Sequence, residues 1–280
     1  MINDFVFLFY FSLSFLSASF YFFHILELSF QKKTKNYKKN IISLVFHTSL
    51  KCKKRCHVIE KLLSSGCKPL DELLGGGFER GIVTQVFGAA GTGKTNICIQ
   101  LAVECVKQGQ KVIFIDTEGL SPVRFKQIAG ENAKEIARNI IIYEPLSFEE
   151  QYSSVREVER IAGENVGLVV LDSATSYYRY ELEDDETGIK SRRELANQIG
   201  FLHALARKHG FAALITNQVY SDVVGGGVRP LGGSSLEHIS KTIIRLEKTG
   251  EGTRRAVLYK HRSRPEGSSA EFTITAEGIR

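Results

Sequence analysis

An eight-residue stretch rich in glycine has the spacing of a phosphate-binding loop. It fits the pattern GxxxxGK[ST], in which successive backbone N–H groups of a curled loop point at phosphate oxygens. Its residues are Gly88, Ala89, Ala90, Gly91, Thr92, Gly93, Lys94 and Thr95. A β-rich run at 82–87 precedes the stretch, and apolar residues with helical spacing follow it. This order of strand, turn and helix separates a phosphate-binding loop from a glycine-rich turn without a ligand.

Two side chains of this stretch have distinct expected roles. We expect the Lys94 ammonium to reach the β- and γ-phosphates of ATP, and the Thr95 hydroxyl to help hold Mg²⁺. The N-terminus of the following helix adds the positive end of its dipole at the same place. The sequence therefore predicts ATP and Mg²⁺ as cofactors.

Polar side chains also follow other predicted strands, where ligands lie in an open parallel sheet. Asp172 ends a strongly apolar strand and is expected to hold Mg²⁺ directly or through water. Glu118 lies just past another strand and is expected to deprotonate the attacking water; the alternative is a solvated loop acid. Gln218 follows a third strand, where an amide would sense the γ-phosphate; the alternative is a polar strand end. Lys94, Glu118 and Gln218 are thus the candidate catalytic residues.

A basic pair near the C-terminus is a candidate for action on a neighbouring subunit. Lys260 and Arg262 are two residues apart, so in a strand they would share one face. There they would supply positive charge in trans to a γ-phosphate. The alternative is a pair of solvated residues at a sheet edge.

The elements that must position these groups alternate between strand and helix. Apolar runs predict strands over 82–87, 112–115, 139–143, 166–172 and 211–216. Helices are predicted over about 67–74, 95–107, 121–129, 147–161 and 195–206. Strands over 241–247, 254–262 and 270–275 follow one another directly, which predicts an antiparallel extension. The predicted fold is α/β, with a mostly parallel, twisted sheet flanked by helices.

The charge of the chain is unevenly distributed. Residues 1–57 hold nine of the 37 Lys and Arg residues but two of the 31 Asp and Glu residues. That leaves 28 basic and 29 acidic residues for 58–280, so this body is close to neutral although the whole chain has a pI of about 9.0. Bulk basicity therefore gives no argument for nucleic-acid binding.

The segment 1–57 differs in composition from the body. Residues 5–26 are 22 residues without Lys, Arg, Asp or Glu, which is long enough to span a bilayer. Three interpretations compete: a non-native extension from an over-extended gene start at a true Val58 codon, a membrane anchor, and a disordered tail. We favour the first because Met1 is the only methionine. We expect 58–280 to be one cytoplasmic ATPase core that does not associate with a membrane.

Five stretches between 66 and 280 together resemble the core of the RecA-family recombinases. They read LDELLGGGFERGIVTQVFGAAGTGKT, FIDTEG, LVVLDSAT, LITNQV and LGGSSLEHISKTIIRLEK. Their order and spacing look like those of the archaeal RadA recombinase. We find neither the helix-hairpin-helix domain nor the F-x-x-A polymerisation motif that RadA carries before its core. In this the chain looks like the compact archaeal paralogues of RadA.

The resemblance implies a RecA-like P-loop NTPase core that binds ATP and Mg²⁺, has weak ATPase activity, binds DNA and supports homologous recombination and repair. RadA, the main recombinase, is the implied partner, and a homo-oligomer is compatible with the family. By the family's motifs, Gly88 to Thr95 bind phosphate, Asp172 the metal, Glu118 is the catalytic carboxylate and Gln218 the sensor. RadA-type chains are less basic at the position of Lys260 and Arg262, which argues against a trans role there.

The same resemblance implies DNA-binding loops at about 177–190 and 219–236. The first contains acidic residues that repel phosphate, namely Glu181, Glu183, Asp184 and Asp185, and its basic residues come at the end. The candidate contacts are the basic residues Lys190, Arg192, Arg193 and Arg229. We therefore expect modest DNA affinity, with single strands preferred, and we expect the tyrosines of the first loop, Tyr177, Tyr178 and Tyr180, to pack rather than to stack on bases.

Two other functions fit the same residues. A RecA-fold signalling ATPase of the circadian-clock type would share the phosphate loop and the pair Lys260 and Arg262, and it would transfer phosphate to itself. A non-hydrolysing switch would dock on the main recombinase when ATP is bound. DNA-stimulated turnover distinguishes the recombination accessory from the first alternative, and single-turnover hydrolysis distinguishes it from the second.

Overall fold

The computed structural model describes residues 62–163, 165–179, 185–221 and 228–280. The segment 1–57 and the acidic residues Glu181, Glu183 and Asp184 lie outside the described residues, so their interpretations stay predictions. Within the described ranges, no helix combines the length and the apolar character needed to cross a membrane.

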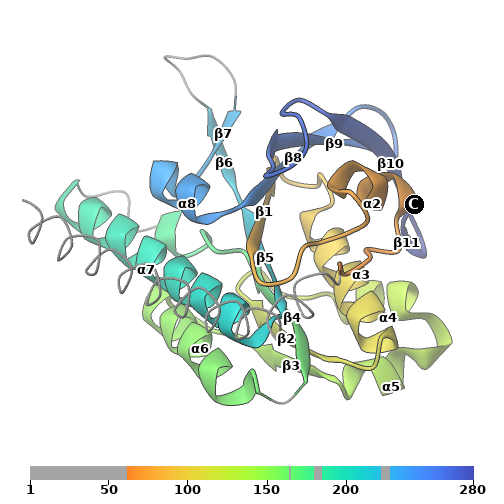
Figure 1. Ribbon diagram of the computed structural model, residues 1–280, viewed down its shortest axis with the longest axis horizontal. Helices are drawn as coiled ribbons and strands as arrows, with labels where there is room; N and C mark the ends of the chain where they lie inside the picture. Colours follow the sequence, from red (N-terminus) through yellow and green to blue (C-terminus); the bar gives the residue numbers. More distant parts are fainter. Residues whose placement is uncertain (1–61, 164, 180–184, 222–227) are drawn as a thin grey trace, which may run out of the picture. The chain divides into compact units, whose positions relative to one another are not determined.

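A nine-stranded sheet is the centre of the described part, in the order β11-β10-β9-β8-β1-β5-β4-β2-β3 (Figure 1). Its strands are β1 (Val83–Gly88), β2 (Lys111–Asp116), β3 (Ile140–Tyr143), β4 (Val166–Asp172), β5 (Ala212–Asn217), β8 (Thr242–Lys248), β9 (Thr253–Lys260), β10 (Ser269–Thr275) and β11 (Gly278–Ile279). Neighbours from β3 to β8 are parallel, and those from β8 to β11 are antiparallel. This confirms the mostly parallel sheet with an antiparallel extension, although β8 itself belongs to the parallel part.

Burial explains why the parallel strands have continuous apolar runs. Every residue of β1, β4 and β5 is buried, because helices cover both faces of this part of the sheet. Along β2, Ile113 packs in one hydrophobic cluster and Phe114 in the other. In β10, by contrast, only Phe272 is fully buried. The antiparallel extension therefore has a face toward solvent.

The helices are α2 (Lys68–Leu74), α3 (Lys94–Lys107), α4 (Pro122–Ala129), α5 (Ala133–Ala137), α6 (Phe148–Ile161), α7 (Asp185–His209) and α8 (Gly233–Ile239). Figure 1 shows α6 and α7 together on one side of the sheet and α2, α3 and α4 on the other. The predicted cap of α4 is present: the Ser121 hydroxyl accepts the Arg124 N–H at 3.2 Å, and Pro122 opens the helix.

Two segments have more regular structure than their sequences indicate. α7 is 25 residues long, and its N-terminal turns extend well before Leu195. The sequence does not indicate these turns, because no apolar residues with helical spacing mark them. Their apolar residue Ile189 is 68% exposed and does not pack in the core. In the second expected loop, β6 (Val219–Ser221) pairs with β7 (Val228–Pro230), and α8 follows directly.

Candidate functional site

Predicted site residues that follow three separate strands, β1, β2 and β5, meet at one cavity of about 470 Å³, and Arg179, which follows β4, joins them. The cavity is lined by most of the stretch 88–95 and by Glu118, Arg179 and Gln218. The strands β1, β2, β4 and β5 are parallel neighbours, so their carboxyl ends lie at the same edge of the sheet. The topology therefore brings together groups that lie far apart in the sequence.

The glycines of the phosphate loop are required by its backbone. Gly93 has φ of 101° and caps α3, which begins at Lys94. At Gly88, a Cβ atom would lie 2.6 Å from the Leu246 carbonyl oxygen, which is closer than real Cβ atoms approach. The loop thus turns tightly from β1 into α3 and begins close against β8, a curled conformation that can point backbone N–H groups at an anion.

The Lys94 ammonium lies within the loop. It donates to the carbonyl oxygens of Gly88 at 2.9 Å and Ala89 at 3.3 Å. Burial lowers the pKa of Lys94, and the Glu118 and Asp172 carboxylates oppose that shift. An ammonium that is partly desolvated and bound by neutral carbonyls is stabilised by an anion, so the site fits a phosphate group.

The Asp172 carboxylate is buried at the end of β4. It accepts a hydrogen bond from the Thr216 hydroxyl and another from the Thr95 hydroxyl. Burial raises the pKa of Asp172, and these two hydrogen bonds oppose the shift. A bound divalent cation would favour the charged carboxylate, and a carboxylate beside a hydroxyl is a donor set that fits Mg²⁺.

Glu118 and Gln218 are in direct contact, although they are 100 residues apart in the sequence. The Gln218 Nε2 group donates to Glu118 Oε1 at 2.9 Å. The buried Asp116 carboxylate holds the loop that carries Glu118, since it accepts the N–H groups of Glu118 at 3.2 Å and Gly119 at 2.9 Å. Glu118, the candidate base, is exposed, but these hydrogen bonds restrain both its loop and its carboxylate.

Comparison with known proteins decides the family. A family model described as Rad51 matches residues 54–280. The chain belongs to the Rad51 family. It is 71% identical over 221 residues to the DNA repair and recombination protein RadB of Methanococcoides burtonii, a match that covers 79% of this chain and 98% of that one. It is also 48% identical over 219 residues to the DNA repair and recombination protein RadB of Archaeoglobus fulgidus. This match covers 78% of this chain and 97% of that one.

A solved structure agrees with these matches. The chain superposes on a protein described as the RadB recombinase with a TM-score of 0.69 and 39% identity, over 78% of this chain and 98% of that one. The chain therefore lies on the RadB branch of the Rad51 family, as its motifs indicate. Nucleotide binding is implied by membership of this family.

Within this Rad51-family site, three residues were missed by sequence reasoning. Arg179 donates from Nη1 to Gln218 Oε1 at 3.3 Å. On the outer side of the phosphate loop, Arg254 donates to the Gly91 carbonyl oxygen at 3.1 Å, and the Lys248 ammonium lies 3.1 Å from where a Gly91 Cβ would be. Lys248 and Arg254 come from the antiparallel extension, whose fold over the loop no local pattern reveals.

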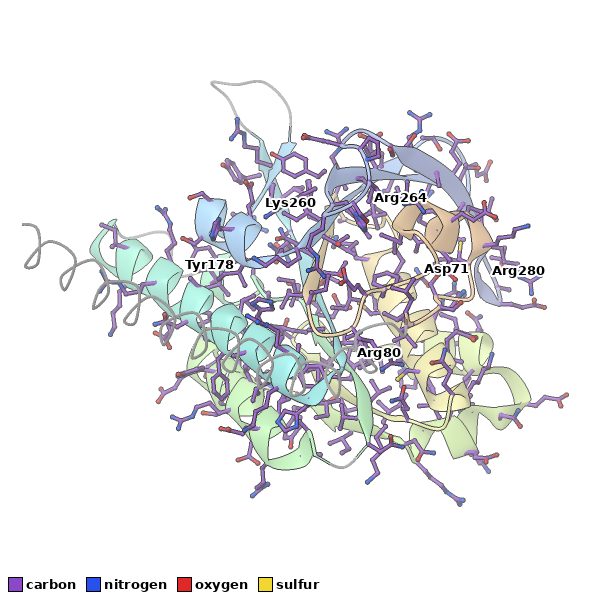
Figure 2. The ribbon with its side chains drawn as sticks, in the orientation of Figure 1. Asp71, Arg80, Tyr178, Lys260, Arg264 and Arg280 are labelled. Atoms are coloured by element: carbon purple, nitrogen blue, oxygen red, sulfur yellow. The ribbon has the colours of Figure 1, made fainter. Side chains whose placement is uncertain are left out.

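The basic pair near the C-terminus does not share a strand face, so that expectation is wrong. β9 ends at Lys260, and Arg262 lies beyond it. The Lys260 ammonium (labelled in Figure 2) donates to the carbonyl oxygens of Glu237 at 2.6 Å and Ser240 at 2.9 Å. Arg262 pairs instead with Glu79. The C-terminal carbonyls of α8, an element that the sequence did not indicate, fix the direction of Lys260.

The candidate DNA-binding residues fall on regular elements of this Rad51-family chain. Lys190, Arg192 and Arg193 are exposed on α7, and Arg229 is exposed on β7. They lie on a helix and a strand rather than in open loops. Whether they contact DNA stays a prediction.

Two of the tyrosines pack, as expected. Tyr178 is 2% exposed and lies against Phe148, with ring centroids 6.4 Å apart (Tyr178 is labelled in Figure 2). The Tyr177 hydroxyl donates to the Pro145 carbonyl oxygen at 2.6 Å. Tyr180 lies outside the described residues.

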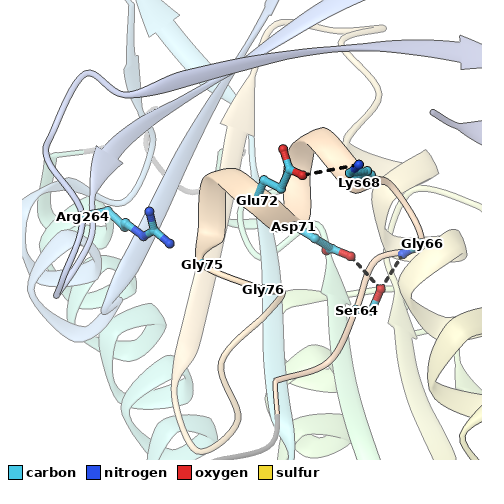
Figure 3. A pocket seen from close by; sticks show the side chains of 8 residues that line it. All are labelled: Ser64, Gly66, Lys68, Asp71, Glu72, Gly75, Gly76 and Arg264. Carbon is cyan, nitrogen blue, oxygen red and sulfur yellow. Dashed lines mark hydrogen bonds and ion pairs between the residues drawn. The ribbon is translucent and has the colours of Figure 1, made fainter.

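A second cavity, of about 540 Å³, lies between α2 and Arg264 (Figure 3). Its carboxylates are largely engaged: Asp71 accepts the Ser64 hydroxyl at 2.6 Å, and Glu72 lies 3.8 Å from Lys68. None of the predicted site residues lines this cavity. The contacts of Asp71 and Glu72 hold α2 to the segment around it.

Proposed function

We propose that the chain is a cytoplasmic Rad51-family protein that binds ATP with Mg²⁺ and hydrolyses it weakly. It binds DNA and assists homologous recombination and repair, by modulating the main recombinase RadA. The observation that carries the proposal is that Lys94, Thr95 and Glu118 line one cavity, with the buried Asp172 carboxylate bonded to Thr95 directly behind them. The names of the RadB relatives support the role in repair and recombination.

Each group of the site has its own role in the proposed binding and hydrolysis of ATP. Backbone N–H groups of the loop bind the phosphates, and Lys94 exchanges its carbonyl partners for phosphate oxygens. The Thr95 hydroxyl and the Asp172 carboxylate would hold Mg²⁺, which would supply positive charge to the phosphates. Glu118 takes a proton from the attacking water, and Gln218 orients the Glu118 carboxylate.

Partner capture tests the proposed role directly. The body 58–280, immobilised with and without ATP, is expected to retain RadA more strongly when ATP is present. Lys94→Ala is the matched control, because it removes the nucleotide response and leaves the surface unchanged. Equal retention under all conditions would remove RadA as the partner of the ATP-bound state.

Hydrolysis distinguishes the competing functions. We expect slow single-turnover hydrolysis that single-stranded DNA accelerates. Phosphate transferred to the chain itself would favour the signalling ATPase, and no turnover with or without DNA would favour the docking switch.

DNA binding is expected to depend weakly on salt. The body is close to neutral, so few Lys and Arg side chains can face phosphate at once. We expect a log–log salt slope of about −1 to −3 for single strands, where each neutralised phosphate contributes about −0.7. Joint Arg192→Ala and Arg193→Ala replacement is expected to weaken binding more than Arg229→Ala. A titration across salt concentrations measures both, and a steeper slope would place the contact surface elsewhere.

The segment 1–57 is expected to be dispensable. A match over 221 residues already covers 98% of the M. burtonii relative, and the family model begins at residue 54. Deleting 1–57 should therefore leave ATP affinity and DNA affinity unchanged. N-terminal sequencing of the native protein provides a second test. Native protein that begins at Met1 and is recovered in the membrane fraction would contradict the expectation that 1–57 is dispensable.

A further inference from the structure

A chain of three side chains connects Arg179 to the candidate base. Arg179 Nη1 donates to Gln218 Oε1 at 3.3 Å, and Gln218 Nε2 donates to Glu118 Oε1 at 2.9 Å. All three residues line the nucleotide cavity. Arg179 has no role in the proposed function so far, and no sequence pattern singled it out.

The chemistry of the three groups allows only one direction for this chain. A guanidinium has donors and no acceptor, and an ionised carboxylate has acceptors and no donor. An amide between them must therefore present its oxygen to Arg179 and its NH₂ group to Glu118. Arg179 and Glu118 thus favour the same orientation of the Gln218 amide, and Arg179 anchors its oxygen end.

One buried residue fixes the separation of Arg179 and Gln218. The Thr175 hydroxyl accepts the Gln218 backbone N–H at 3.2 Å, and the Thr175 carbonyl oxygen accepts the Arg179 backbone N–H at 3.2 Å. Thr175 lies in the turn just after β4 and is 0% exposed. The backbones of Arg179 and Gln218 are therefore held by the same buried residue, which keeps their exposed side chains within reach of each other.

We propose that Arg179 is a positioning residue for Glu118, acting by anchoring the oxygen of the Gln218 amide whose NH₂ group holds the carboxylate. The inference rests on the proposed ATPase function. With Arg179 present, the NH₂ group of Gln218 holds one carboxylate oxygen of Glu118, and the other oxygen is left for the proton of water. Without Arg179, the oxygen end of the amide loses its anchor, and the Gln218 side chain holds the Glu118 carboxylate less firmly in one position.

Three replacements of Arg179 separate this role from general charge effects. Arg179 does not contact the reacting atoms and acts through Gln218, so its loss should cost less than the loss of the base itself. We expect Arg179→Ala to lower kcat about threefold to tenfold and to leave KM unchanged. Arg179→Lys retains a donor and should restore most of kcat. Arg179→Glu accepts only, so it competes with Glu118 for the NH₂ group of Gln218 and should lower kcat further than Arg179→Ala.

A matched control tests the charge change alone. Arg138 is exposed at the end of α5, away from the cavity, so Arg138→Glu should leave kcat and KM unchanged. A rise in KM with unchanged kcat in Arg179→Ala would overturn the proposal, because it would make Arg179 a direct phosphate contact. Equal kcat in the Lys and Glu variants would overturn it too.

A measurement without turnover keeps the inference separate from the proposed ATPase. In the nucleotide-free protein, the Gln218 side-chain NH₂ resonances, assigned by their loss in Gln218→Ala, report the bond to Glu118. We expect them to shift in Arg179→Ala and Arg179→Glu and to stay in place in Arg179→Lys. Unshifted resonances in all variants would refute the positioning role, whereas absent hydrolysis with shifted resonances would refute the ATPase alone.

Discussion

Replacing Lys94 by Ala is expected to abolish tight ATP binding. Lys94 is the only side-chain cation of the phosphate loop, and its ammonium now lies against the loop carbonyls of Gly88 and Ala89. Losing two charge-assisted hydrogen bonds of about 1.5–3 kcal/mol each lowers the affinity at least about a hundredfold. Equilibrium dialysis with ATP and Mg²⁺ measures the effect.

The control for this replacement lies at the other end of the same helix. Lys107 pairs with Glu104 on the exposed surface, so Lys107→Ala removes an equal charge without touching the cavity. We expect it to keep the parental ATP affinity. If Lys94→Ala binds ATP as tightly as Lys107→Ala does, the phosphates are held elsewhere and the assignment of the loop fails.

The parts of the site that the sequence revealed are those whose cause is local or periodic. The phosphate loop is one continuous stretch whose glycines satisfy its own backbone, as Gly93 shows. Asp172 and Glu118 each follow a continuous apolar run, and parallel strands must bring such residues to one edge. The contact between Glu118 and Gln218 follows from that topology. Each residue follows its own strand, so their proximity is expected although they are far apart in the sequence.

The parts that the sequence did not reveal depend on pairing between distant elements. Arg254 reaches Gly91 only because β9 folds back beside β8, a register that no local pattern specifies. Lys260 points at the end of α8, so its direction depends on a helix within a glycine-rich segment. Arg179 needs both β4 and β5 in place, because Thr175 connects it to Gln218. Such groups are recognised only once the neighbouring strand is known.

Replacing Glu118 by Gln is expected to keep ATP binding and to lower hydrolysis at least about tenfold, within the range of general-base effects. The new amide has nearly the same shape, and its oxygen can still accept the Gln218 NH₂ group, so the position of the side chain is retained. What is lost is the ability to take a proton. ATP affinity from dialysis and single-turnover hydrolysis, measured on the same preparation, separate the two.

The comparison with Glu118→Ala makes this assignment sharper. Alanine removes the carboxylate and also the partner of Gln218, so any hydrolysis that depends on the position of the amide is lost with it. If Glu118 is the base, Glu118→Gln and Glu118→Ala hydrolyse equally slowly, because proton removal limits both. If Glu118 only positions Gln218, Glu118→Gln keeps the parental rate and Glu118→Ala does not. Turnover of Glu118→Gln equal to that of the parent would therefore remove Glu118 from the proton transfer and leave it as a support for Gln218.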